Sequence, residues 1–337
     1  MKRLLTILLI ALFSLPVQAE TLKIATVTPE GSQWMKEMRA SAKEIEERTE
    51  GRFKVNYYGG GVMGNDQKVL IRIRLRSLQG GAFTPSSLVS QYADLNLYGL
   101  TMVFDSEEEA AYARSRLDVR LSQGLEEAGW VNFGFAAGGF ANLMSNIPIR
   151  TLDDLKGKKV WIPEGDTISR QSMEALSLTP VSLPLTDVLT GLQTGLIDIV
   201  AMSPVGALVL QWHTKVKYVT EIPLVYTLGF MAVDKRAFDK ISDADQAVVR
   251  EVMERTYRSF DQQNLVDNRE AFEALLNAGI ESVPIDVDEY NRVRAALLQS
   301  NRQLGQQGAF SLDLYDEMMR YVEEYRREQQ ASAGSTN

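Results

Sequence analysis

The side chains best suited to contact a small molecule follow three short apolar segments in the middle of the chain. These segments are predicted strands at 159–162, 180–183 and 197–202, separated by predicted helices at 167–176 and 186–194. Such a succession predicts a parallel α/β unit, which binds ligands at the carboxyl ends of its strands. The residues at those ends are Trp161, Glu164, Leu185, Met202 and Ser203. They offer stacking, apolar contact and hydrogen bonding, which favours ligand binding over catalysis.

Two other segments could contribute to the same site. Phe83 and Thr84 end a predicted strand at 80–83, where backbone amides could meet a ligand. Phe140 and Asn142 belong to the sequence Gly-Gly-Phe-Ala-Asn, which we interpret as the crossing from one half of the protein to the other. We therefore expect these four residues to join the ligand-binding set.

Most of these candidates also have a purely structural interpretation. Trp161 could fill the core beneath its strand, and the apolar candidates are as typical of core as of a site. Arg170 could supply an anion contact, as could Arg72 or Lys68, but each also fits a solvated helix surface. Both interpretations stay open at this point.

Catalytic signatures are scarce in this chain. It has one histidine, His213, and no cysteine, and it lacks the nucleophile-elbow, phosphate-loop and zinc-protease motifs. Its carboxylate pairs lie at predicted helix starts, where the helix dipole explains them. We predict a binding protein that is not an enzyme, with no catalytic residue, no metal and no cofactor.

The first 19 residues have the pattern of a secretory signal peptide. Lys2 and Arg3 precede an apolar stretch at 4–15, which is too short to span a bilayer, and small residues at 17–19 suit cleavage. Absence of cysteine excludes a lipid anchor and, in an exported protein, indicates a bacterial periplasm. A net charge of −8 disfavours nucleic acid as a partner. We expect a periplasmic protein of a Gram-negative bacterium, without direct membrane insertion.

The remaining elements divide into two predicted lobes. Before residue 140 the pattern predicts strands at 22–27, 53–58, 80–83 and 131–137, and helices at 32–49, 66–79, 106–116 and 118–128. Ser32 and Ser106 are expected to cap the helices that they begin. After residue 204 it predicts strands at 217–222, 227–233 and 280–283, and helices at 242–278, 286–304 and 312–327. Ser242 is expected to cap the first of these helices and Gly279 to end it. Lobe 1 is predicted to comprise 20–140 and about 234–265, lobe 2 to comprise 141–233 and about 266–328, and 329–337 to be a disordered tail. The helix at 242–278 exceeds the usual length of about 11–12 residues, so we expect it to lie across both lobes.

With these residues laid out, the chain resembles the extracytoplasmic solute receptors of tripartite ATP-independent periplasmic (TRAP) transporters. The motifs that carry the resemblance are Pro29-x-Gly31-Ser32-x-Trp34, Gly64-Asn65-Asp66, Leu152-x-x-Leu155-Lys156-Gly157, Pro163 and Leu192-Gln193-Thr194-Gly195-x-x-Asp198. The resemblance implies a two-lobed α/β periplasmic binding protein of the Venus-flytrap type. It also implies closure of the lobes over a small organic solute and docking on a small and a large membrane subunit, with transport driven by an ion gradient.

Three positions depart from the family pattern. Trp161 stands where most members carry an arginine that holds a ligand carboxylate, Ala141 stands near a second arginine position, and Ser203 replaces an asparagine. A carboxylate in a closed cleft without its counter-charge is destabilised by several kcal/mol. We therefore expect a ligand other than a simple dicarboxylate. A periplasmic enzyme or a sensory receptor on the same fold are the alternatives.

Overall fold

The computed structural model describes residues 20–334, so the predicted signal peptide at 1–19 lies outside the described residues, as do residues 335–337. The chain begins with alternating strands and helices: β1 (Glu20–Ala25), α2 (Gln33–Arg48), β2 (Phe53–Tyr58), α3 (Asp66–Arg74) and β3 (Gly80–Phe83). Ser32 caps α2 as its sequence position predicts, because its Oγ accepts a hydrogen bond from Met35 N at 3.2 Å. The helix expected at 66–79 is confirmed as the shorter α3.

A single helix follows where two were predicted. After α4 (Pro85–Leu88) and the 3-10 helix η1 (Ala93–Gly99), helix α5 runs without a break from Glu107 to Glu127. The predicted break at residue 117 is wrong because Leu117 is fully buried and continues one apolar face with Ala113 and Leu121. Ser106 caps α5 through a bond from Glu109 N, as expected.

The strand predicted at 131–137 is two strands, β4 (Trp130–Asn132) and β5 (Ala136–Ser145). The sequence Gly-Gly-Phe-Ala-Asn at 138–142, interpreted above as a crossing between halves, instead lies inside β5. The glycines of this segment coincide with an irregularity of the strand pairing. The register between β5 and β9 shifts between Ala137 and Gly139 and again between Ala141 and Leu143. Gly139 has φ +84° at the first shift, a conformation that suits glycine.

The middle of the chain contains many short elements. They are η2 (Leu152–Leu155), β6 (Trp161–Pro163), α6 (Thr167–Ala175), β7 (Val181–Leu183), η3 (Leu185–Asp187), α7 (Val188–Thr194), β8 (Ile199–Met202), α8 (Pro204–Val209) and η4 (Trp212–Lys215). The predicted strands and helices are confirmed here, but their pairing is only partly the expected parallel unit. Strands β6 and β7 are parallel, whereas β8 pairs antiparallel with β5 and meets residue Val160 through one parallel bridge to Ile199.

Strand β9 (Tyr218–Asp234) is one strand of 17 residues where two were predicted. Pro223 interrupts the sequence pattern, and its segment bulges out of the ladder, because β5 pairing moves from Val225 directly to Thr220. A bulge is where a strand tolerates proline. Asn142 completes the bulge, since its Oδ1 accepts a hydrogen bond from Ile222 N at 3.1 Å.

The carboxyl-terminal part is mainly helical. Its elements are α9 (Lys235–Phe238), α10 (Asp243–Asn277), β10 (Glu281–Val283), α11 (Val287–Gln306) and α12 (Leu312–Gly334). Ser242 caps α10 by accepting a bond from Asp245 N, and Gly279 has φ +93° just beyond its end, as predicted. Helix α12 includes residues 329–334, so the expectation of a disordered tail is wrong for that part.

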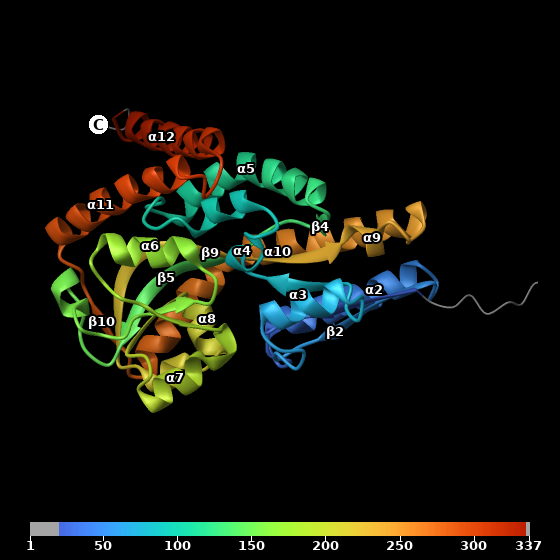
Figure 1. The fold of residues 1–337 in the computed structure, drawn as a ribbon, viewed down its shortest axis with the longest axis horizontal. Coiled ribbons are helices and arrows are strands. Elements are labelled where there is room, and N and C mark those ends of the chain that lie inside the picture. The colour runs from blue at the N-terminus through green and yellow to red at the C-terminus, as the bar shows by residue number, and fades with distance from the viewer. Residues whose placement is uncertain (1–19, 335–337) are drawn as a thin grey trace, which may run out of the picture.

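The molecule has two lobes that share one sheet (Figure 1). The sheet has the order β2-β1-β3-β9-β5-β8, with β4 and β10 also pairing with β9, while β6 and β7 form a separate pair. We call the part containing β1 to β3, α2 and α3 lobe 1, and the part containing β6 to β8 and α6 to α8 lobe 2. Because β9 pairs with β3 of lobe 1 and with β5, which in turn pairs with β8 of lobe 2, it connects the two lobes. The lobe boundaries predicted from sequence stay a prediction.

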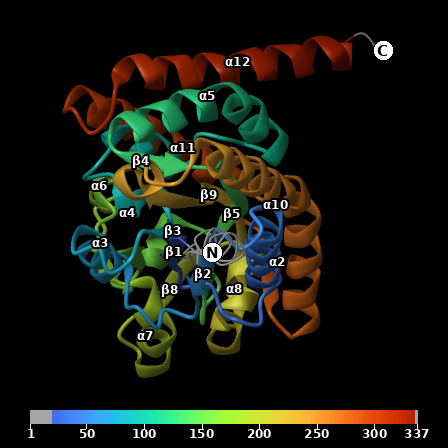
Figure 2. The same cartoon turned by 90° about the vertical axis from the view of Figure 1, so that its right-hand side faces the viewer.

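Helix α10 extends along both lobes, as the sequence predicts (Figures 1 and 2). Its first half packs on α2, where Val252, Met253 and Tyr257 join a cluster with Met35 and Met38. Its second half packs on α8, where Leu275 joins a different cluster with Ala207. One continuous helix therefore contributes to two separate hydrophobic cores, one around Met35 and one around Ala207.

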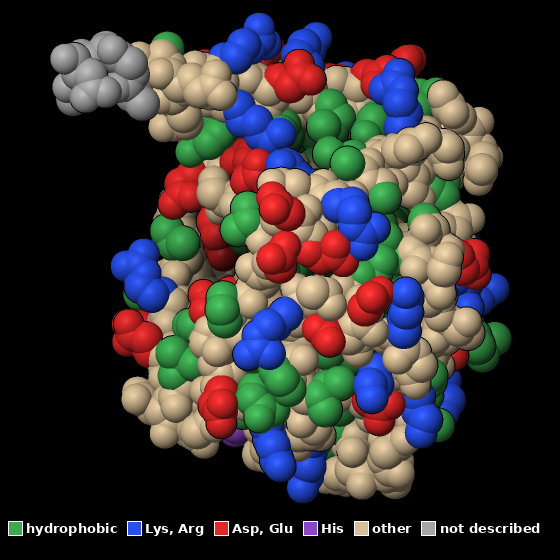
Figure 3. Space-filling model, turned by 90° about the vertical axis from the view of Figure 1, so that its left-hand side faces the viewer, with side chains coloured by type: hydrophobic (Ala, Val, Ile, Leu, Met, Phe, Trp, Pro, Cys, Tyr) green, Lys and Arg blue, Asp and Glu red, His purple; other side chains and the backbone are tan. Residues whose placement is uncertain are grey.

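Helix α12 packs on α5 at the top of the view in Figure 2. Met318 and Val322 of α12 are fully buried in the cluster that includes Leu117 and Leu121 of α5. On the face in Figure 3, acidic and basic side chains are interspersed, and no extended patch of one charge is present on that face.

Candidate functional site

A cavity of about 320 Å³ lies between the lobes. Lobe 1 lines it with the segments 26–29, 65–67 and 83–87. Lobe 2 lines it with residues 184–186 and with Trp161, Pro163, Glu164, Asp166, Met202, Ser203, Val205 and Gly206. Strand β9 contributes 225–230, and α10 contributes Tyr257 and Phe260. A cavity of this size suits a small organic molecule.

Seven of the ten residues predicted to contact a ligand line this cavity. They are Phe83, Thr84, Trp161, Glu164, Leu185, Met202 and Ser203. They come from the carboxyl ends of β3, β6, β7 and β8, which is the position that the α/β rule indicates. The strand ends thus converge even though the strands do not all belong to one sheet.

The other three candidates lie outside the cavity lining. The ring of Phe140 packs edge-to-face against Tyr226, with centroids 5.1 Å apart. Asn142 holds the β9 bulge through Ile222 N and donates to the carbonyl oxygen of Phe140 at 3.3 Å. Arg170 is exposed on α6. These placements favour the structural interpretation for all three.

Trp161 both packs and lines the cavity. Its side chain is 4% exposed, its Nε1 donates to the carbonyl oxygen of Leu183 at 3.0 Å, and its ring meets Trp212 edge-to-face at 5.2 Å. It also borders a second, smaller cavity of about 120 Å³ that β6, α6, β9 and α11 line together. Packing in the core and contact with a ligand, the two interpretations of Trp161 left open by the sequence, are therefore compatible, because one ring can pack in the core and also line the cavity.

Three carboxylates line the cavity. Glu164 is exposed, and its Oε2 accepts a hydrogen bond from Asn65 Nδ2 at 3.0 Å. Asp66 accepts a hydrogen bond from Ser87 Oγ, and burial raises the pKa of Asp66, with a further rise from the charge of Glu164. Burial also raises the pKa of Asp166, whose oxygens cap α6 by accepting bonds from Ser169 N and Oγ at 2.9 and 2.7 Å. Negative charge therefore dominates the polar part of the wall.

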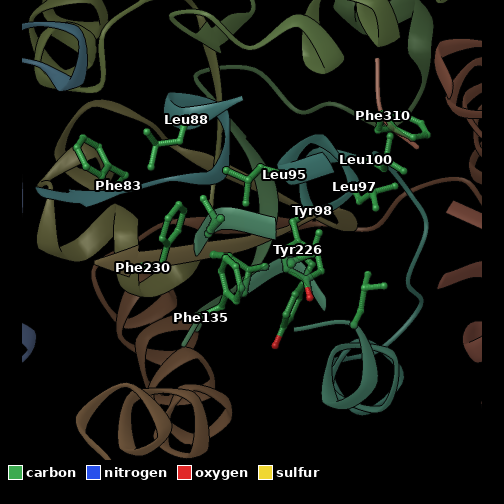
Figure 4. Close-up of a cluster of buried hydrophobic side chains, with 14 of the residues drawn as sticks. Phe83, Leu88, Leu95, Leu97, Tyr98, Leu100, Phe135, Tyr226, Phe230 and Phe310 are labelled. Carbon is green, nitrogen blue, oxygen red and sulfur yellow. The ribbon is translucent and has the colours of Figure 1, made fainter. Parts of the chain in front are cut away.

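Aromatic rings form much of the remaining wall. Besides Phe83 and Trp161 they are Trp34, Tyr98, Tyr226, Phe230, Tyr257 and Phe260. Figure 4 shows Phe83, Tyr98, Tyr226 and Phe230 in one apolar cluster. The hydroxyl of Tyr226 donates to Glu107 Oε2 at 3.3 Å, and burial raises the pKa of Tyr226. The tyrosine hydroxyl thus has a protein partner, although Tyr226 also lines the cavity.

Among residues 20–334, those that line the cavity include no lysine and no arginine. A buried guanidinium, Arg114, lies behind Tyr226, with its Cζ 5.9 Å from the ring centroid. It donates to Asp261 at 2.7 Å, to Asp118 at 2.9 Å and to the carbonyl oxygen of Phe135 at 2.9 Å. Its charge is therefore matched by two protein carboxylates, Asp118 and Asp261.

Several cavity residues were not found from the sequence. Tyr226, Leu228 and Phe230 belong to the part of β9 that spans the lobes, and the sequence pattern divides that strand near Pro223. Asp66 was interpreted only as part of the Gly-Asn-Asp turn motif. An acidic residue directly after an N-cap asparagine is explained by the helix dipole, so no signal in the sequence separated it from other helix starts.

The chain matches the family model for bacterial extracellular solute-binding proteins, family 7, over residues 24–307. It is 25% identical over 200 residues to an uncharacterized protein, YiiZ, of Salmonella typhimurium, covering 58% of this chain and 61% of that protein. It is 27% identical over 176 residues to the C4-dicarboxylate-binding periplasmic protein DctP of Shewanella loihica, covering 52% and 51%. The chain thus spans about half to three fifths of the length of these relatives.

Solved structures share the fold. A TRAP periplasmic solute-binding protein from Xanthobacter autotrophicus with bound β-D-galacturonate superposes with a TM-score of 0.81 at 20% identity, covering 90% of this chain and 99% of that one. The sugar acid binding protein DctPAm from Advenella mimigardefordensis, in complex with galactonate, gives a TM-score of 0.84 at 17% identity, covering 91% and 99%. These likenesses confirm the two-lobed α/β fold expected above.

Within the described residues, no helix is both long and apolar enough to cross a bilayer. The family match covers most of the chain. The site at the strand ends and the long helix agree with the sequence pattern, and the interlobe cavity agrees with the two lobes that the resemblance implies. This chain belongs to family 7 of the bacterial extracellular solute-binding proteins.

Proposed function

We propose that this protein is the periplasmic receptor of a TRAP-type secondary transporter, and that it captures a small organic solute in the cavity between its lobes. The observation that carries the proposal is the cavity itself, which both lobes line with the ends of their strands. A ligand that touches both lobes binds the closed arrangement more tightly than the open one, and this difference in affinity favours closure. The closed receptor then docks on a small and a large membrane subunit.

The proposed ligand is not a simple dicarboxylate. Relatives are named for different solutes: one from Escherichia coli is a 2,3-diketo-L-gulonate-binding periplasmic protein, and solved structures carry galacturonate or galactonate. In this chain Trp161 occupies the position where the resemblance leads us to expect an arginine. An indole cannot neutralise a carboxylate, so the usual anchoring of an acid is lost.

We further propose that the protein is exported by its amino-terminal signal peptide and acts without catalysis. The carboxylates that line the cavity have structural tasks: Asp166 caps α6, and Glu164 and Asp66 accept hydrogen bonds from Asn65 and Ser87. None of them is hydrogen-bonded to a histidine or a cysteine that could act as a nucleophile or base, as judged over residues 20–334. A receptor role accounts for these groups more simply than an enzyme does.

The test is to identify solutes that bind the purified mature protein. Small molecules retained from the periplasm are measured by native mass spectrometry, and a library of organic solutes is screened for a rise in melting temperature. A receptor is supported if a specific solute binds and is recovered chemically unchanged after prolonged incubation with the protein. Chemical conversion of that solute would favour an enzyme, and the absence of any retained or stabilising solute would contradict the proposal.

A further inference from the structure

We propose that the solute is an organic cation, with an ammonium group held beside Asp66 and Glu164 and an apolar body lying among the aromatic rings of the cavity. This inference rests on the proposed receptor function and names the class of its ligand. It starts from the charges that line the cavity, which are three carboxylates and, within the described chain, no lysine or arginine.

The two carboxylates approach each other from different lobes. Asp66 opens α3 in lobe 1, and Glu164 follows β6 in lobe 2. Glu164 accepts a hydrogen bond from Asn65, the residue directly before Asp66, at 3.0 Å. The charge of Glu164 also raises the pKa of Asp66, which is the expected effect of a like charge nearby. A cation between them would remove a repulsion that otherwise opposes contact of the lobes.

Each carboxylate has one oxygen left for a ligand. Asp66 Oδ2 accepts a hydrogen bond from Ser87 and Glu164 Oε2 accepts one from Asn65. No donor within residues 20–334 forms a hydrogen bond to Asp66 Oδ1 or to Glu164 Oε1. Asp166 differs, because Ser169 engages both of its oxygens. The pair Asp66 and Glu164 therefore offers two acceptors to an ammonium, which carries several donors.

The rest of the wall suits the body of such a solute. Trp34, Phe83, Tyr226 and Phe230 line the cavity, and the hydroxyl of Tyr226 is bonded to Glu107. Aromatic rings attract cations and bury apolar groups, so they add to the binding of an amine with a ring or a bulky alkyl group.

The alternatives fit the cavity less well. An anionic solute would bring a further negative charge beside Asp66 and Glu164. Arg114 does not line the cavity, and its Nη1 and Nη2 already donate to Asp261, Asp118 and the carbonyl oxygen of Phe135. A neutral solute would leave the charged form of the part-buried Asp66 without a counter-charge, whereas a cation offsets the desolvation of that carboxylate.

The experiment compares solutes of equal shape and different charge. The probes are three matched series with phenyl, indolyl and cyclohexyl bodies, each as the ethylamine, the ethanol and the propanoate, with galacturonate and galactonate added. Binding is measured by thermal shift and by calorimetry at pH 7.5 in low and high salt. We expect the amines to bind best, and we expect salt to weaken their binding more than that of the alcohols.

Two variants locate the ammonium. Asp66→Asn and Glu164→Gln keep the shape of each side chain and remove its charge, and each should reduce amine affinity at least about tenfold while leaving alcohol affinity within about threefold. The matched control is Glu254→Gln, an exposed carboxylate of α10 outside the cavity lining, which should change neither affinity. Circular dichroism checks that each variant is folded.

The outcomes separate the two proposals. Tightest binding by a carboxylate or an alcohol series, or equal amine affinity in all variants, would overturn the cationic ligand and leave the receptor function standing. If no probe of any charge binds and no solute is retained from the periplasm, the receptor function fails, and the cationic ligand fails with it.

Discussion

Asn65 Nδ2 donates a hydrogen bond of 3.0 Å to Oε2 of Glu164, and this contact joins the start of α3 in lobe 1 to the segment after β6 in lobe 2. The same asparagine caps α3, because its Oδ1 accepts a hydrogen bond from Lys68 N at 3.1 Å. The side chain of Asn65 therefore both caps α3 and contacts lobe 2, and a substitution can change one of these contacts without the other.

Asn65→Asp should favour the open arrangement of the lobes. Aspartate caps a helix as well as asparagine does, so α3 is retained. Its carboxylate would face Glu164, and like charges about 4 Å apart repel each other by about 1 kcal/mol in bulk water and by more near a protein surface. Small-angle X-ray scattering of the unliganded protein should show a larger radius of gyration. Asn65→Ser keeps the cap without the added charge and should give a smaller change; equal values for both variants would contradict this prediction.

Asp66→Asn should raise the stability of the unliganded protein at neutral pH. Burial raises the pKa of Asp66 above its ordinary value of 3.8, so its charged form is disfavoured in the folded state. Wild-type stability therefore falls as pH rises from about 3.8 through the raised pKa, and the variant lacks this loss. Loss of a favourable dipole interaction, about 0.3–1 kcal/mol, offsets part of the gain. The difference in melting temperature should be largest near pH 7 and shrink toward pH 4; a difference independent of pH would refute the assignment.

Trp161→Ala should cost about 3–5 kcal/mol of unfolding free energy, because it removes a buried ring that packs on Trp212. Trp161→Phe keeps most of the ring and loses the hydrogen bond from Nε1 to the carbonyl oxygen of Leu183, so it should cost less, about 1–3 kcal/mol. Urea unfolding followed by far-ultraviolet circular dichroism measures both. Near-wild-type stability of Trp161→Ala would show that the ring lines the cavity without supporting the core.

Gly139→Ala should destabilise the protein more than Gly195→Ala. Both glycines have positive φ, +84° and +68°, so each alanine is strained by about 1–2 kcal/mol. At Gly139 a Cβ would also lie 2.5 Å from Nδ2 of the buried Asn268, whereas at Gly195 nothing lies within 4 Å. Asn268 donates to the carbonyl oxygen of Gly138 and would have to move. Chemical denaturation of the two variants compares the costs, and equal costs would mean that Asn268 adapts freely.

Local signals in the sequence predicted the helices well. Ser32, Ser106 and Ser242 cap the helices that they were expected to cap, and Gly195 ends α7 in the left-handed conformation. Each of these features depends on interactions within four residues of the signal. The same reasoning failed at Leu117, where burial of one continuous face mattered more than the local pattern.

Pairing between distant segments could not be predicted in the same way. Strand β9 continues through Pro223 because β5 accommodates a bulge there and Asn142 bonds to it, and neither residue is near the other in sequence. For the same reason Asn142 was expected at the ligand and lies instead in the sheet. Tyr226 was missed because its place in the cavity wall follows from that continuous strand.

The 35 residues of α10 correspond to a rod of about 52 Å that is fixed to α2 at one end and to α8 at the other. Two lobes joined only by loops could close with little resistance. Here closure of the lobes would also require α10 to bend, because the helix is packed on both. If the lobes close on a ligand as proposed, bending of α10 would store part of the binding free energy and would favour reopening once the ligand has left. The bending stiffness of α10 would thereby influence the rate at which the unliganded protein reopens.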